Sequence, residues 1–153
     1  MLRALRDLFD RLAPERSGAN DEQSLRLATA VLLVEVVRAD PGVQPGEREA
    51  LLAALRQRFA LDADAAEDLV ARARQESLEA NDFFSFTSVV NERFSHPQKV
   101  DVIEEMWRIA YADGRLDPNE NHVISKVAGL LHVTHGEYIA AKLRARDDAA
   151  PSS

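Results

Sequence analysis

The sequence predicts an all-α protein, a compact bundle of about seven to eight helices. Apolar residues recur at helical spacing through most of the chain, and no stretch alternates with the period of two that marks a half-buried strand. Glycine and proline number only six each, so breaks between long helices are few. In addition, two segments share one helix-loop-helix pattern, so we expect the bundle to be built on two pseudo-repeated units.

Composition sets the class of protein. A chain of 153 residues, 46% hydrophobic and 29% charged, is long enough for one domain with a real core. It has no cysteine, which excludes disulfides and thiolate metal sites. The net charge is −7 and the arginines are scattered, which disfavours nucleic-acid binding. The longest apolar run, 27–37, is too short to span a bilayer and no signal peptide is visible, so we expect a cytoplasmic protein.

The N-terminal segment 1–20 is predicted to form a short amphipathic helix followed by a linker. Leucines at helical spacing alternate with arginines over 2–12, and the polar segment 13–21 carries Pro14 and Gly18. Such a helix could lie on a membrane surface, but we favour packing on the domain or on a partner.

Residues 21–146 are predicted to form the helical domain. The almost continuously apolar segment 25–38 is typical of a central buried helix. Three more segments follow in order: a helix that opens at Pro45 and presents a leucine face up to Phe59, a helix over 63–79, and a core-packing helix over 81–96 with four phenylalanines (Phe83, Phe84, Phe86 and Phe94).

The second half of that domain is predicted to hold three helices. One begins near Pro97 and buries Trp107 beside Val100 and Ile103, because these positions share a face. Another opens at Pro118, and a last helix covers 135–146. The tail, 147–153, is predicted to be disordered.

The repeated pattern joins Val36–Leu52 to Ile109–Ser125. Aligned without gaps, so that Val36 falls on Ile109, the two segments match at six positions. Each is an apolar helix ending in Ala-Asp, then a tight loop, then a proline-opened helix with glutamate in its first turn. The matched pairs are Ala39 with Ala112, Asp40 with Asp113, Val43 with Leu116, Pro45 with Pro118, Glu47 with Glu120, and Leu51 with Ile124.

Helix capping alone explains part of this pattern. Asp117 is suited to an N-cap, Pro118 to the first helical position, and Glu120 to completion of a capping box. Such a cap stabilises by about 1 kcal/mol. Glu47 has the same position behind the weaker cap Gln44. Capping is therefore an alternative explanation for both glutamates.

Asp40 and Asp113 are not explained by capping. Each is predicted at a helix C-terminus, where the macrodipole disfavours an anion. Carboxylates from two loops could together hold an oxygen-coordinated cation such as Ca²⁺ or Mg²⁺. The pattern is not an EF-hand, because the required run of alternating aspartates is missing.

These residues resemble the TerB family, the tellurite-resistance-associated helical domain that is also related to the N-terminal region of DjlA-type co-chaperones. The matching motif is Ala-Asp-Gly followed by a glutamate, found as 112–114 with Glu120 and as 39–40 with Glu47. The resemblance implies a divalent-metal site at Asp40, Glu47, Asp113 and Glu120, with Ca, Mg, Mn or Zn as the candidate ions. This chain departs from the motif at Pro41, where glycine is expected.

The resemblance implies a non-enzymatic binding module with a protein partner, linked to bacterial stress response, tellurite resistance and membrane-associated complexes. Two alternatives remain open. The same carboxylates could activate water in a metal-dependent hydrolase, or the chain could be a structural adaptor with capped helix starts. Glu35 and Arg108, which fall on each other in the same alignment, could pair or could each face solvent. The four histidines fit no zinc pattern.

Overall fold

A computed structural model describes residues 14–39, 45–112 and 116–149 of the chain, and these residues contain helices and no strand. The prediction of an all-α protein is confirmed. None of the described helices is long and apolar enough to cross a membrane. In chain order the helices are α2 (Pro14–Ala39), α3 (Pro45–Phe59), α4 (Ala63–Glu79), α5 (Phe84–Arg93), α6 (His96–Ala110), α7 (Pro118–Leu130) and α8 (His135–Ala149).

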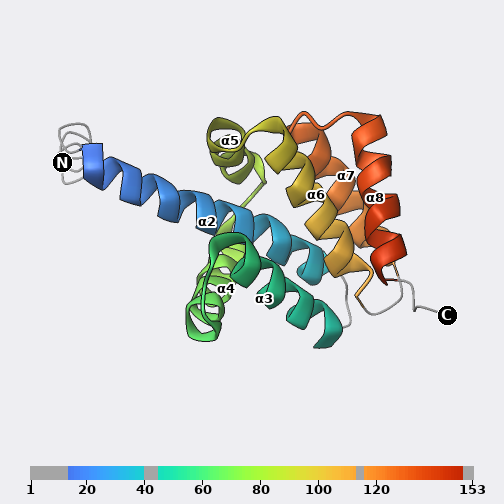
Figure 1. Cartoon of the computed structure of the whole chain (residues 1–153), viewed down its shortest axis with the longest axis horizontal. Coiled ribbons are helices and arrows are strands. Elements are labelled where there is room, and N and C mark those ends of the chain that lie inside the picture. Colours follow the sequence, from blue (N-terminus) through green and yellow to red (C-terminus); the bar gives the residue numbers. More distant parts are fainter. Residues whose placement is uncertain (1–13, 40–44, 113–115, 150–153) are drawn as a thin grey trace.

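Helix α2 is the central helix of the bundle. Between Ala30 and Val36 its side chains are at most 1% exposed, apart from that of Glu35. A helix that is apolar on nearly every side must be covered on every side. Helices α3, α4, α5, α6 and α7 all pack against it. Its N-terminal turns extend beyond the other helices (Figure 1).

Helix α6 is the second centre and packs against α2, α3, α7 and α8. Trp107 is completely buried on it, as its predicted face requires. The ring of Trp107 stacks on Tyr111 with centroids 6.0 Å apart and meets Tyr138 of α8 at 5.3 Å. The ammonium of Lys142 lies 5.1 Å from the centre of the indole. This aromatic cluster holds α8 on α6.

The helices on either side of α5 can be grouped into two halves, α2–α4 and α6–α8. Helices α3 and α7 begin at Pro45 and Pro118, the two prolines that the sequence alignment matches. Helix α2 packs on α3 and α4, and α6 packs on α7 and α8. The pattern found in the sequence covers two helices of each half, whereas the packing adds a third helix, α4 or α8.

The turns that lead into α4 and α8 share a backbone conformation and a backbone hydrogen bond. Ala60 and His132 adopt positive φ angles of 53° and 61°. The next amide in each turn bonds a carbonyl five residues back, Leu61 to Arg56 and Val133 to Ala128, both at 3.0 Å. This is the bond that closes a helix in a Schellman motif. Positive φ is uncommon outside glycine, and it occurs in both turns, although in the gapless alignment Ala60 falls on Val133 and not on His132.

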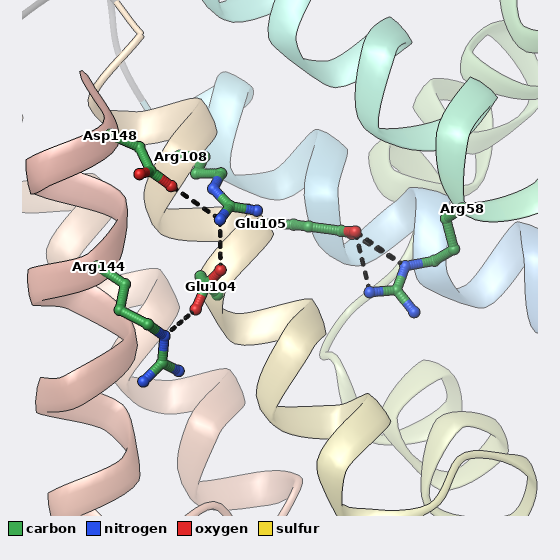
Figure 2. A network of polar contacts seen from close by, with 6 residues as sticks. All are labelled: Arg58, Glu104, Glu105, Arg108, Arg144 and Asp148. Carbon is green, nitrogen blue, oxygen red and sulfur yellow. Dashed lines mark hydrogen bonds and ion pairs between the residues drawn. The ribbon is translucent and has the colours of Figure 1, made fainter.

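Two ion-pair groups flank α6 (Figure 2). On the side facing α8, Glu104 accepts from Arg144 and, at 2.5 Å, from Arg108, which also reaches Asp148 at 2.9 Å. These ion pairs connect the C-terminal half of α8 to α6. Because the arginines are about half exposed, water screens their contribution to stability.

On the other side of α6, Glu105 binds the guanidinium of Arg58 from α3, with contacts of 2.9–3.1 Å. Both side chains are largely buried. Burial raises the pKa of Glu105, although Arg58 opposes that shift. A buried pair of this kind fixes the position of α3 on α6 more than it adds net stability.

Glu137 joins the N-terminal ends of α6 and α8. Its carboxylate accepts the backbone N–H of Thr134 at 2.9 Å, and Thr134 in turn accepts the N–H of Glu137 through its hydroxyl. The same carboxylate contacts Nε2 of His96 at 2.8 Å. The backbone bond, and next the His96 contact, lower the pKa of Glu137 to about 2.

Several element boundaries differ from those predicted. The expected linker over 13–21 is helical from Pro14 onward, because proline is accepted in a first helical turn. The tail predicted to be disordered from Asp147 onward is helical through Ala149, where the Asp148 contact supports it. Residues 2–12, predicted as an amphipathic helix, lie outside the described part of the chain.

Two side-chain placements also correct the sequence analysis. Phe84 is 66% exposed, whereas Phe83, Phe86 and Phe94 pack against the core as predicted. Glu35 and Arg108 do not pair with each other. Glu35 binds Arg38 and Ser77, and Arg108 binds Glu104 and Asp148, so each contacts its own half of the bundle.

We predict that Trp107→Ala lowers the free energy of unfolding by about 3–5 kcal/mol, because it leaves a large cavity among well-packed rings. Urea unfolding followed by circular dichroism measures this change. Leu143→Ala on α8, where the side chain is 41% exposed, is the control and should cost far less. Equal losses in both variants would contradict the packing described for Trp107.

We predict that Glu137→Gln lowers the melting temperature most above about pH 4.3, the unfolded-state pKa of glutamate. Because the folded pKa is depressed to about 2, the carboxylate stabilises the fold above about pH 4.3, and that stabilisation is lost as the pH falls toward 2. Thermal melts of both proteins across this range are the measurement. A difference in melting temperature that stays constant with pH would show that the ionised form has no special role.

Candidate functional site

The structure describes two of the four predicted metal ligands. Glu47 and Glu120 lie in the described part of the chain, whereas Asp40 and Asp113 lie outside it. Helix α2 ends at Ala39 and α6 ends at Ala110. The site can therefore be built from the two glutamates and the helix ends around them.

Glu47 and Glu120 occupy equivalent positions. Each is the third residue of a helix that begins with proline, and each is 0% exposed. Fully buried glutamates are rare, because removal of a carboxylate from water is costly unless partners surround it. Both side chains interact with further groups of the protein. Because both glutamates are buried at equivalent positions, their burial is a shared property of these two helix starts.

The start of α7 has the capping arrangement that the sequence predicts. The carboxylate of Asp117 accepts the N–H of Asn119 at 2.8 Å, and Oε1 of Glu120 accepts the N–H of Asp117 at 3.1 Å. Capping therefore accounts for one oxygen of Glu120. It does not by itself explain why the whole carboxylate is buried, since a capping box works equally well at the surface.

The start of α3 contacts the end of α6. A Cβ atom placed on Gly46 would lie 3.2 Å from the carbonyl oxygen of Ala112. Gly46 directly precedes Glu47, so the start of α3 lies close to the backbone that follows α6. The N-terminus of α3 carries a partial positive charge and the C-terminus of α6 a partial negative charge, so this approach is also electrostatically favourable.

The chemistry available here is that of hard oxygen ligands. Buried carboxylates beside helix-end carbonyls suit Ca²⁺ or Mg²⁺ better than a soft metal. Within the described residues no group of three or more histidine, aspartate or glutamate side chains is arranged to hold a metal. Glu47 and Glu120 alone are therefore an incomplete site, and any cation would need ligands from residues outside the described ranges.

Two features of the structure were not found from the sequence. The role of Gly46 depends on a contact with a residue far away in the chain, although a glycine in a first helical turn is a weak signal for close approach. A surface cavity of about 210 Å³ also went unpredicted, and it is lined by other residues than Glu47 and Glu120.

The fold and the site together define an all-helical module in which two proline-opened helices each bury a glutamate in the first turn. The family model described as tellurite resistance protein TerB matches residues 26–143, most of the chain. The protein therefore belongs to the TerB family, as the Ala-Asp-Gly motif predicts. No curated protein and no solved structure matches the chain significantly.

We predict that Gly46→Ala destabilises the protein although alanine is the better helix former. The added methyl group would lie 3.2 Å from the backbone carbonyl oxygen of Ala112, so that backbone must shift to accommodate it. Gly136→Ala is the matched control, because Gly136 is also the second residue of its helix and a Cβ there meets nothing within 4 Å.

The control should gain stability by up to about 1 kcal/mol, and chemical unfolding of both variants is the measurement. A similar gain for Gly46→Ala would show that the two acidic segments do not need this close approach.

Proposed function

We propose that this protein is a non-enzymatic TerB-type binding module in which a divalent cation joins the two acidic segments. The ligands would be Asp40 and Glu47 from one segment and Asp113 and Glu120 from the other. Ca²⁺ and Mg²⁺ are the first candidates because all four ligands are carboxylates. Mn²⁺ and Zn²⁺ complete the set to be tested.

The observation that carries this proposal is the complete burial of Glu47 and Glu120 at equivalent helix starts. If these two carboxylates and the aspartates that follow the two helix ends converge, they would repel one another. A bound cation would offset this repulsion. The contact of Gly46 with Ala112 supports the proposal, because it brings the start of α3 next to the backbone that follows α6.

A module is favoured over a hydrolase by the same burial. Metal-assisted hydrolysis needs an open coordination position and a cleft that admits substrate. Glu47 and Glu120 are inaccessible to solvent, and the cavity of about 210 Å³ lies at other residues. The TerB family is in general a non-catalytic one. In the proposed role the cation fixes the relative position of α3 and α6.

Membership of the TerB family supports a role in bacterial stress response or tellurite resistance. The protein would act in the cytoplasm through a protein partner, which could itself be membrane-associated. The cation would then set the shape of the surface that this partner recognises.

We predict that a divalent cation raises the melting temperature of the metal-free protein by an amount that grows with the ratio of its concentration to Kd. Asp40→Asn combined with Asp113→Asn should abolish that gain and stabilise the metal-free protein by relief of repulsion. Differential scanning calorimetry with Ca²⁺, Mg²⁺, Mn²⁺ and Zn²⁺ is the measurement, together with the metal content of the purified native protein.

The control removes two charges elsewhere. Asp64→Asn combined with Asp68→Asn changes two exposed residues of α4 and should leave the response to cations intact. If the Asp40 and Asp113 variant responds to every cation as the wild type does, the metal proposal fails, and helix capping is the remaining explanation of the two acidic segments.

A further inference from the structure

A polar cavity of about 210 Å³ opens on the surface where the two halves of the bundle meet. Glu35 and Arg38 from the end of α2 line it, together with Ser77 from the end of α4 and Lys126 from α7. It also includes the segment 80–83 that joins α4 to α5. It is separate from the buried glutamates, since neither of them lines it.

Three of the four charged groups in this cavity are engaged. Ser77 accepts from Arg38 at 2.5 Å and donates to Glu35, and Arg38 also contacts Glu35 at 3.2 Å. The carboxylate of Asp82 accepts the backbone N–H of Phe84 at 2.9 Å. The acidic groups are thus already held by donors from the protein itself.

The fourth charge is Lys126. Its ammonium lies 5.4 Å from the centre of the Phe83 ring, and across the described part of the chain it makes no ion pair or hydrogen bond. A cation over an aromatic face keeps its N–H groups available for an anion. The cavity therefore offers one positive charge that its own residues do not neutralise.

Two exposed apolar side chains lie in or directly after the segments that line the cavity. Leu78 lines it and is 64% exposed, and Phe84, which follows directly on the lining segment, is 66% exposed. Among the described residues the only other large apolar side chain exposed in this way is Leu143 on α8. Exposed apolar groups gathered around a polar cavity are typical of a binding site, whereas singly scattered ones are not.

We propose that this cavity binds a peptide segment of a partner protein in which a carboxylate is flanked by apolar side chains. The carboxylate would pair with the Lys126 ammonium inside the cavity, and the apolar side chains would cover Leu78 and Phe84 at the rim. The site draws on α2 and α4 from one half of the bundle and on α7 from the other. It is independent of the proposed metal site.

Fluorescence anisotropy with a labelled peptide, acetyl-Leu-Glu-Phe-Glu-Leu, tests the proposal on the full chain. The same peptide with lysine in place of glutamate is the charge control. The acidic peptide should bind more tightly, and Lys126→Glu should weaken it by about tenfold or more. Phe84→Ser should weaken both peptides, because it removes rim contacts that do not depend on charge.

Two variants serve as matched controls. Arg72→Glu reverses an exposed charge on α4 away from the cavity, and Leu143→Ser removes the exposed apolar side chain of α8. Neither should change the affinity, and circular dichroism should show all variants folded. The proposal is overturned if the lysine peptide binds as well as the acidic one, or if Arg72→Glu weakens binding as much as Lys126→Glu does.

Discussion

The arrangement of the bundle depends on one constraint, the burial of the middle of α2 on all of its sides. The side chains of Ala30, Val31, Leu32, Leu33, Val34 and Val36 share almost no surface with water. A single neighbour could cover only one stripe of such a helix, so five other helices surround it. Helix α6 packs against α2 and also against α8, which the Trp107 cluster holds in place. The remaining helices fill positions that these two central helices define.

Much of this could be predicted from the sequence, because the relevant signals are local. The all-apolar run of α2, the proline starts of α3 and α7, and the capping box of Asp117 and Glu120 each depend on residues within one or two helical turns. The burial of Trp107 follows from its face on α6. Helix ends were less predictable: α8 extends through Ala149 partly because Asp148 contacts Arg108, a residue 40 positions earlier.

The equivalence of Glu47 and Glu120 was predictable from the sequence, whereas their surroundings were not. The gapless alignment that places Glu47 on Glu120 is visible in the sequence, and both residues occupy the equivalent positions expected. Their complete burial was not expected, since a glutamate in a first turn is usually exposed. The contact of Gly46 with Ala112 and the cavity around Lys126 both arise from tertiary packing between distant segments, for which a single sequence carries no direct signal.

The placement of Trp107 has a spectroscopic consequence. It is the only tryptophan of the chain, and its immediate aromatic neighbours, Tyr111 and Tyr138, are the only two tyrosines. Emission excited in the near ultraviolet therefore originates almost entirely from the α6–α8 half, with the tyrosines positioned to transfer their excitation to the indole. Tryptophan and tyrosine emission therefore does not report directly on α3 and α4. The far-ultraviolet dichroism signal, in contrast, reports the helix content of both halves. Any lag between the two signals during denaturation would measure how tightly the two halves are coupled through α2.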